Sequence, residues 1–218
     1  MTHGSGETGT RHVCPTEAIA GVLIGGQSRR MGTCKALLPY HGTTFVDRVV
    51  SVARSAVDEV VLLGNTDLCI PVSTGVRRLE DKPTFAGPLA GLVPLIEYAG
   101  HRWSLLIACD MPLIETKILQ RLLDACDPTV DAAAFRVRSE HSTSFPCCAV
   151  FHPRVASDVR TELARSASLR SLIGRVRCRV VEAEPSEARC LQNFNTLEEY
   201  AALSRPHEEL VTLAGCAR

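Results

Sequence analysis

The sequence predicts an α/β protein: a single-domain, Rossmann-like three-layer sandwich built around a mainly parallel sheet. Short apolar segments alternate with segments of helical spacing along most of the 218 residues. The apolar segments are hydrophobic throughout instead of at every second residue, which is typical of strands covered by helices on both faces. The sequence shows no internal repeat and no linker to a second domain, so one domain accounts for the pattern.

The strands are expected where the chain is continuously apolar. The first is AIAGVLI at 18–24, and WSLLIACD at 103–110 is also too apolar for a strand with one exposed face. Further strands are expected at 59–64, 131–137, 147–152 and 178–183.

The helices are expected between these strands. The segment 44–57 has the spacing of an amphipathic helix, with Phe45, Val49 and Val52 along one side. The other expected helices are 87–100, 115–126, 154–165 and 196–205. Residues 1–17 are rich in Gly, Ser and Thr and lack periodicity, so we expect a flexible N-terminal tail, a folded domain at 18–204 and a C-terminal tail at 205–218.

Composition excludes several classes of function. Lys and Arg together number 24, as do Asp and Glu, so no nucleic-acid partner is expected. The N-terminus has no apolar signal core, and no apolar run is long enough to span a bilayer, so we expect a cytoplasmic protein with no membrane partner. In that compartment the ten cysteines are expected to be reduced thiols. No CxxC spacing supports a metal centre, so most of them are expected to be small buried hydrophobes.

The turn after the first strand, within LIGGQSRRMGTCKALL at 23–38, has the character of a phosphate-binding loop. Gly25 and Gly26 can offer backbone N–H groups to oxyanions, and Arg29, Arg30 and Lys35 add positive charge. The stretch lacks both the GxGxxG pattern and the Ser or Thr that follows the lysine of a P-loop. It therefore predicts a different and longer phosphate loop.

Asp110 ends the apolar strand in ACDMPLI and is a candidate Mg²⁺ ligand. The carboxyl ends of parallel strands meet in one crevice, so Asp110 and the glycine loop are expected to face each other, as nucleotidyl or phosphoryl transfer requires. Simpler interpretations remain open. Gly25-Gly26 can be a tight turn, Asp110 the N-cap of the following helix, Asp81 a turn residue before Pro83, and Arg29 a solvated surface charge.

Four motifs in order resemble the molybdopterin nucleotidyltransferase family, which builds dinucleotide forms of the molybdenum cofactor. They are LIGGQSRRMGTCKALL (23–38), EDKPTFAGPLAGL (80–92), ACDMPLI (108–114) and NFNTLEEY (193–200). The resemblance spans residues 19 to about 203 and is strongest to the guanylyltransferase branch. It implies a nucleotide-diphospho-sugar-transferase-like fold and makes 18–204 a nucleotidyltransferase domain.

The resemblance also implies a reaction and a set of site residues. GMP would pass from GTP to the terminal phosphate of molybdopterin or the molybdenum cofactor, with Mg²⁺ as cofactor and release of pyrophosphate. Other cofactor-biosynthesis proteins or molybdoenzyme chaperones are candidate protein partners. The resemblance implies that the backbone of Leu23, Ile24, Gly25 and Gly26 forms a cradle for GTP and that Asn65 and Asp81 contact the guanine nucleotide. It implies that Lys35 and Arg30 bind phosphate and take part in catalysis, and that Asp110 binds Mg²⁺ and takes part in catalysis. Asn193 and Asn195 would lie near the metal and the acceptor.

The sequence departs from the family pattern at four positions. Cys34 stands where an acid usually precedes the lysine, Ile24 replaces an alanine, Leu197 replaces a proline, and Phe145 replaces a polar residue before Pro146. These departures leave two alternatives: a related nucleotidyltransferase that uses CTP or another phosphorylated acceptor, and a degenerate, non-catalytic cofactor-binding protein.

Overall fold

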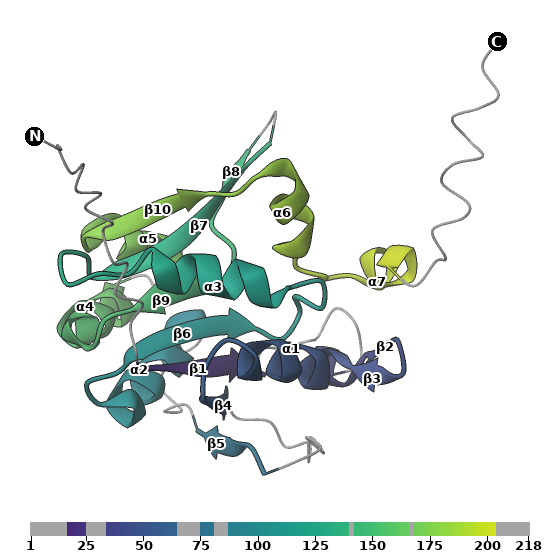
Figure 1. Cartoon of the computed structure of the whole chain (residues 1–218), viewed down its shortest axis with the longest axis horizontal. Coiled ribbons are helices and arrows are strands. Elements are labelled where there is room, and N and C mark those ends of the chain that lie inside the picture. Colours follow the sequence, from purple (N-terminus) through teal and green to yellow (C-terminus); the bar gives the residue numbers. More distant parts are fainter. Residues whose placement is uncertain are drawn as a thin grey trace, which may run out of the picture.

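The computed structural model describes residues 17–24, 34–64, 75–80, 87–139, 142–165 and 168–203 (Figure 1). Apart from Glu17, the tails predicted at 1–17 and 205–218 lie outside the described residues, and so does most of the glycine loop. No helix among the described residues is long and apolar enough to cross a membrane.

Within the described residues, one mixed sheet of eight strands organises the fold, seven of them in the order β10-β7-β9-β6-β1-β4-β5 and β8 paired with β7. β1 (Ala18–Leu23) lies at the centre, parallel to β4 (Glu59–Leu63) on one side and to β6 (Trp103–Ala108) on the other. The remaining strands are β5 (Arg77–Leu79), β7 (Ala132–Arg138), β8 (Thr143–Ser144), β9 (Cys148–Phe151) and β10 (Cys178–Glu182).

The direction of each strand confirms the mainly parallel sheet and adds one exception. β4–β5 and β7–β10 are parallel, whereas β9 runs antiparallel to both of its neighbours, β6 and β7. β6 and β7 therefore point the same way, and their carboxyl ends share the edge where β1 and β4 also end. Sequence periodicity predicts the apolar strand at β9 but contains no information on its direction.

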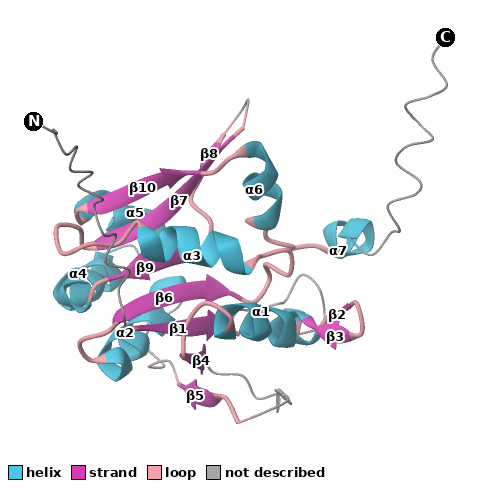
Figure 2. Ribbon diagram, viewed as in Figure 1, coloured by secondary structure: helices cyan, strands magenta, loops and turns pink. Residues whose placement is uncertain are grey.

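Helices cover both faces of the sheet, which confirms the three-layer architecture (Figures 1 and 2). α1 (Phe45–Arg54) and α3 (Thr116–Asp124) pack on the face formed by Ala20 and Val22 of β1. α2 (Pro88–Ala99), α4 (Ala156–Arg165) and α5 (Leu169–Arg175) pack on the face formed by Ile19 and Leu23. Alternate residues of β1 thus enter two separate cores, which is why β1 has no polar side chain.

α2 approaches the sheet closely because glycines stand at the contact. A Cβ on Gly21 of β1 would lie 2.5 Å from Leu63 Cδ1 and 2.7 Å from Leu95 Cδ2. A Cβ on Gly91 of α2 would lie 2.6 Å from Leu23 Cδ2. Any larger side chain at Gly21 or Gly91 would therefore push α2 away from the sheet.

Several short elements were not expected from the sequence. They are the two-stranded hairpin of β2 (Pro39–Tyr40) and β3 (Thr43–Thr44), the strands β5 and β8, the helices α5 and α6 (Pro185–Cys190), and two 3-10 turns, η1 (Lys35–Leu37) and η2 (Pro153–Val155). Each has at most seven residues, too few for a clear hydrophobic period. The hairpin turn is made by His41 and Gly42, both with positive φ.

Candidate active site

The site lies at the carboxyl edge of the sheet, where β1 and β6 end beside each other. The Cys109 N–H donates to the Leu23 carbonyl oxygen at 3.0 Å, so Asp110 leaves β6 next to the end of β1. α3 begins only at Thr116 and takes Glu115 as its N-cap, so the interpretation of Asp110 as the cap of the following helix is wrong. The Asp110 side chain therefore does not cap the helix and is 15% exposed.

Lys35 reaches Asp110 from the other end of the glycine loop. It opens η1, and its Nζ lies 3.4 Å from Asp110 Oδ2 and donates to Asn195 Oδ1 at 2.7 Å. The Lys35 side chain is 20% exposed. A cation with so little water around it, fixed by two oxygen partners, is well placed to bind an incoming anion.

The segment NFNT at 193–196 completes the cluster from the far end of the sequence. Asn193 Nδ2 donates to Asp110 Oδ1 at 2.6 Å, and the Phe194 N–H donates to the Asp110 carbonyl oxygen at 2.9 Å. Asp110 is therefore held through both its side chain and its backbone, and its carboxylate orientation is set before any ligand arrives.

Helix α7 (Leu197–Leu203) fixes the position of Asn195. The Glu199 carboxylate accepts from the backbone N–H groups of Asn195 and Thr196, while Thr196 Oγ1 accepts from the Glu199 N–H at 3.1 Å. This reciprocal pattern is a capping box. It ties the residue that contacts Lys35 to the first turn of α7.

An aromatic cluster joins this segment to the chain that carries Lys35. Phe194 packs with Leu38 and Phe45, and the ring centroids of Phe45 and Phe194 lie 6.5 Å apart. Tyr200 of α7 lies 5.9 Å from the Phe45 ring and donates its hydroxyl to the Pro39 carbonyl oxygen at 2.9 Å. Both sides of the Lys35–Asn195 contact are therefore anchored to one small apolar core.

Two neutral thiols, those of Cys109 and Cys147, lie near the Asp110 carboxylate. Burial, reinforced by the Asp110 carboxylate, raises the pKa of Cys147 to about 12, and the same two causes raise the pKa of Cys109 well above its usual range. All seven cysteines in the part of the chain that the structure describes are free. Cys109, Cys126 and Cys148 are buried, whereas Cys34, Cys147, Cys178 and Cys190 are only partly buried, so small buried hydrophobes account for fewer of these cysteines than predicted.

A cavity of about 630 Å³ opens on the β7–β9 side of the cluster. Asn193 lines it and also contacts Asp110, so the cavity and the charged cluster share a wall. Its lining is mixed: Val137, Phe145 and Pro146 are apolar, Cys147 is a thiol, and Arg189 is a cation. A space of this size can hold a small molecule with both apolar and polar groups.

The structure thus brings together four of the predicted site residues, Lys35, Asp110, Asn193 and Asn195. Leu23 and Ile24 also lie at this edge with buried side chains. The Ile24 N–H already donates to the Leu63 carbonyl oxygen at 2.9 Å, so it is not available to a phosphate. The others, Gly25, Gly26, Arg30, Asn65 and Asp81, lie outside the described residues, as does Arg29.

Sequence reasoning missed three features that shape the site. Glu199 and Tyr200 hold the NFNT segment, and Arg189 lines the cavity. The TLEE stretch does contain the T-x-x-E signature of a capping box, which predicts the role of Glu199. Nothing in the sequence pairs Tyr200 with Pro39 or brings Arg189 to the cavity.

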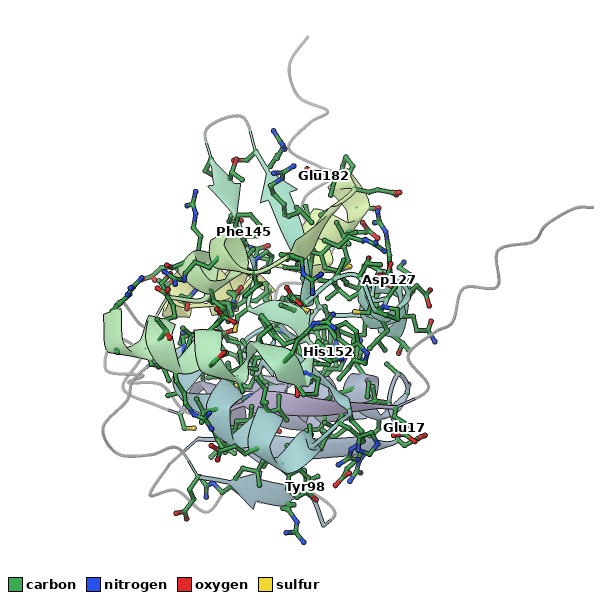
Figure 3. All side chains as sticks on the ribbon, turned by 90° about the vertical axis from the view of Figure 1, so that its left-hand side faces the viewer. Glu17, Tyr98, Asp127, Phe145, His152 and Glu182 are labelled. Atoms are coloured by element: carbon green, nitrogen blue, oxygen red, sulfur yellow. The ribbon has the colours of Figure 1, made fainter. Side chains whose placement is uncertain are left out.

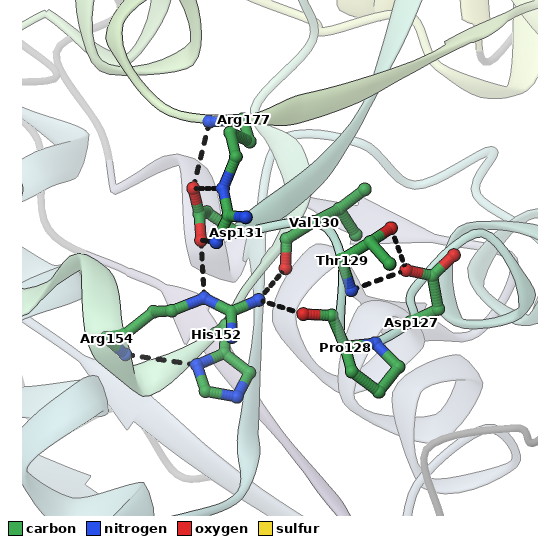
Figure 4. Close-up of polar contacts among 8 residues, drawn as sticks. All are labelled: Asp127, Pro128, Thr129, Val130, Asp131, His152, Arg154 and Arg177. Atoms are coloured by element: carbon green, nitrogen blue, oxygen red, sulfur yellow. Dashed lines mark hydrogen bonds and ion pairs between the residues drawn. The ribbon is translucent and has the colours of Figure 1, made fainter.

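The opposite edge of the sheet holds a saturated polar cluster instead of a site (Figure 4). Asp131, just before β7, accepts from the Arg177 side chain at 2.8 and 2.9 Å and also pairs with Arg154. The Arg177 guanidinium, together with the Arg177 N–H and Arg154, holds the pKa of Asp131 far below its usual range. Arg154 further donates to the carbonyl oxygens of Pro128 and Val130, so this cluster braces the loop before β7.

The fold and the charged cluster at its carboxyl edge define a three-layer α/β domain with polar side chains gathered where β1 and β6 end, the place where open α/β sheets bind ligands. Comparison with known families is more specific: residues 20–181 match the model of the MobA-like NTP transferase domain, and the chain belongs to that family. The resemblance inferred from the four motifs is confirmed.

Individual relatives agree with this assignment. A protein of Bacillus mycoides named probable molybdenum cofactor guanylyltransferase is 31% identical over 186 residues, which covers 82% of this chain and 92% of that protein. The crystal structure of molybdopterin-guanine dinucleotide biosynthesis protein A from Archaeoglobus fulgidus superposes with a TM-score of 0.69 at 17% identity, covering 89% of this chain and 99% of the other. The bifunctional IspDF of Campylobacter jejuni has a TM-score of 0.71 at 12% identity, covering 86% of this chain and 54% of the other. Both structures are similar in fold.

Proposed function

We propose that this chain transfers GMP from GTP to the terminal phosphate of molybdopterin or of the molybdenum cofactor, with release of pyrophosphate and formation of a guanine dinucleotide. The observation that carries the proposal is the cluster of Lys35, Asp110, Asn193 and Asn195 at the carboxyl edge of the sheet. The names of relatives at 31% identity support the choice of nucleotide and acceptor.

The donor set around Asp110 suits Mg²⁺. The ion takes one or two carboxylates together with substrate phosphates and water, and it prefers oxygen ligands. Asp110 supplies one oriented carboxylate, and the nearby thiols of Cys109 and Cys147 are held neutral by burial. Among the described residues no group of three His, Cys, Asp or Glu side chains could form an all-protein metal cage. Asp110 would hold the ion, which when bound would neutralise phosphate charge.

The transfer itself requires positioning and charge stabilisation more than proton transfer. A terminal phosphate oxygen of the acceptor forms a bond to the α-phosphorus of GTP. The bond from that phosphorus to the bridging oxygen breaks, and pyrophosphate leaves with the electron pair. An acceptor phosphate is already anionic near neutral pH, so no general base is needed. The Lys35 ammonium group and, in this proposal, Arg30 stabilise the charge that develops on the phosphates.

The geometry suggests which substrate occupies which side of Asp110. β1, which leads into the glycine loop in the sequence, lies on one side of β6, and β9 and β7, beside the cavity, lie on the other. We assign GTP to the loop side and the acceptor to the cavity. In this proposal the acceptor phosphate meets the α-phosphate beside Asn193, which lines the cavity and donates to Asp110.

The first experiment compares GTP and CTP by calorimetry with and without Mg²⁺ and then follows GMP or CMP transfer to molybdopterin. We expect Mg²⁺-enhanced binding of GTP and formation of the guanine dinucleotide. A preference for CTP would retain the fold and the chemistry but reject the guanylyltransferase assignment. Absence of binding of either nucleotide would reject the enzyme and favour a non-catalytic cofactor-binding protein.

A further inference from the structure

Phe145 occupies a distinctive place in the cavity. Phe145 lines the cavity and is half-buried, and the Cζ atom of Arg170 lies 6.0 Å from the centroid of its ring. Arg170 is not among the residues that line the cavity. The cavity thus has one aromatic wall that is braced by a cation.

The backbone around Phe145 ties this wall to the charged cluster. The Ala108 N–H at the end of β6 donates to the Cys147 carbonyl oxygen at 2.9 Å, and the Cys148 N–H donates to the Pro146 carbonyl oxygen at 2.7 Å. Phe145 therefore stands two residues from a strand-end bond that lies directly before Cys109 and Asp110. Its position relative to Asp110 is set by the sheet.

The other walls of the cavity determine what kind of group Phe145 can hold. Leu191 and Val137 are apolar, Asn193 and Gln192 carry amides, and Arg189 carries a positive charge. Phe145 has no hydrogen-bonding atom, so its contribution to binding is contact with a flat surface. Amides and a cation at the periphery of an aromatic wall suit the polar edge of a planar heterocycle.

We propose that Phe145 is a specificity-determining residue that holds the planar ring system of the acceptor by stacking, with Arg170 as the positioning residue that fixes the Phe145 ring. This inference rests on the proposed function and deepens it. It makes the enzyme selective for phosphorylated pterins over phosphorylated acids or polyols of similar length. Selection acts on acceptor binding and leaves the binding of GTP unchanged.

The test uses the full chain and a fluorescent pterin phosphate, 6-hydroxymethylpterin monophosphate, whose fluorescence reports binding directly. Phe145→Leu removes the ring and keeps an apolar side chain of smaller volume, whereas Phe145→Tyr keeps the ring. We expect Phe145→Leu to weaken pterin binding roughly tenfold, since stacking on one aromatic ring contributes about that factor. Phe145→Tyr should bind like the wild type.

Arg170 is tested against a matched pair elsewhere in the molecule. Arg170→Met should weaken pterin binding about threefold, the effect expected for losing a cation from an exposed aromatic face. Arg77→Met is the control, because Arg77 lies 5.5 Å from the centroid of the Tyr98 ring. Tyr98 lies at the end of the molecule opposite Phe145 (Figure 3), so this variant should bind pterin like the wild type.

Acceptor kinetics separate this inference from the proposed function. In the GMP-transfer assay, Phe145→Leu should raise the KM for molybdopterin while leaving kcat and the KM for GTP unchanged. Equal pterin binding by wild type and Phe145→Leu, or no pterin binding by the wild type, would overturn the role of Phe145. If pterin binding depends on Phe145 but no GMP is transferred, the proposed reaction is rejected and the role of Phe145 in pterin binding is kept.

Discussion

Replacing Asp110 with asparagine separates the chemistry of the site from the stability of the fold. The substitution keeps the shape of the side chain, and the Phe194 N–H can still donate to the backbone carbonyl of residue 110. An amide oxygen can also accept the hydrogen bond from Asn193 that the carboxylate accepts at 2.6 Å. What is lost is the negative charge opposite Lys35 and the carboxylate that the proposal assigns to Mg²⁺.

The two losses differ in size. At 3.4 Å the raw attraction between Lys35 and Asp110 is about 5 kcal/mol at an effective dielectric constant near 20. Desolvation offsets most of this, so the net contribution of the pair to stability is about 1 kcal/mol or less. For a domain of this size that corresponds to a fall in Tm of roughly 2–4 °C. Loss of charge stabilisation in the transition state should lower kcat by roughly 10²–10³.

The assay follows GMP transfer at saturating Mg²⁺ and records thermal unfolding of the same preparations. We expect Asp110→Asn to be folded and nearly inactive, and Asp110→Glu to recover part of the activity. Full activity of the Asp110→Asn protein in Mg²⁺ would refute the metal assignment. A large fall in Tm would show instead that the pair with Lys35 is chiefly structural.

Three further predictions follow from other contacts. Asn195→Ala removes the amide that orients Lys35 and should lower kcat about tenfold with little change in Tm, measured in the same assays. The pKa of Asp131 is lower in the folded protein than in the unfolded chain, so its carboxylate stabilises the fold above about pH 4, and this stabilisation is lost as pH falls towards the folded pKa. Denaturant titrations should show that the free energy of unfolding falls less on acidification in Asp131→Asn than in the wild type. Gly91→Ala places a Cβ 2.6 Å from Leu23 Cδ2 and should destabilise by about 1–3 kcal/mol in the same titrations.

Local patterns predict the sheet because its central strands are buried on both faces. Six segments rich in apolar residues became β1, β4, β6, β7, β9 and β10 within a few residues of their expected bounds, although β10 is only partly buried. The antiparallel direction of β9 could not be predicted, because a strand covered on both faces has the same composition in either direction. β5 and β8 were missed because they have only three and two residues.

The meeting of Lys35 with Asp110 was predictable because each follows a strand that ends at the same edge of the sheet. The resemblance implied that Asn195 lies near the metal and the acceptor, but the contact of Lys35 with Asn195 was not predicted. It depends on an aromatic cluster whose members, such as Tyr40, Phe45 and Tyr200, are far apart in the sequence. Periodicity places Phe45 on one side of a helix, but no local pattern says which residues it will meet.

The place of Cys34 explains how this chain does without the usual acid before Lys35. Cys34 is half-buried and packs against the apolar core that contains Cys109. A carboxylate at this position would have to be desolvated against apolar surface, whereas a thiol fits such surroundings as a small hydrophobe. Lys35 already has the Asp110 carboxylate at 3.4 Å and the Asn195 amide oxygen at 2.7 Å as partners. The lysine is therefore oriented by groups that arrive from β6 and from the segment before α7. Its position depends on these tertiary contacts and does not require an acidic neighbour in the sequence.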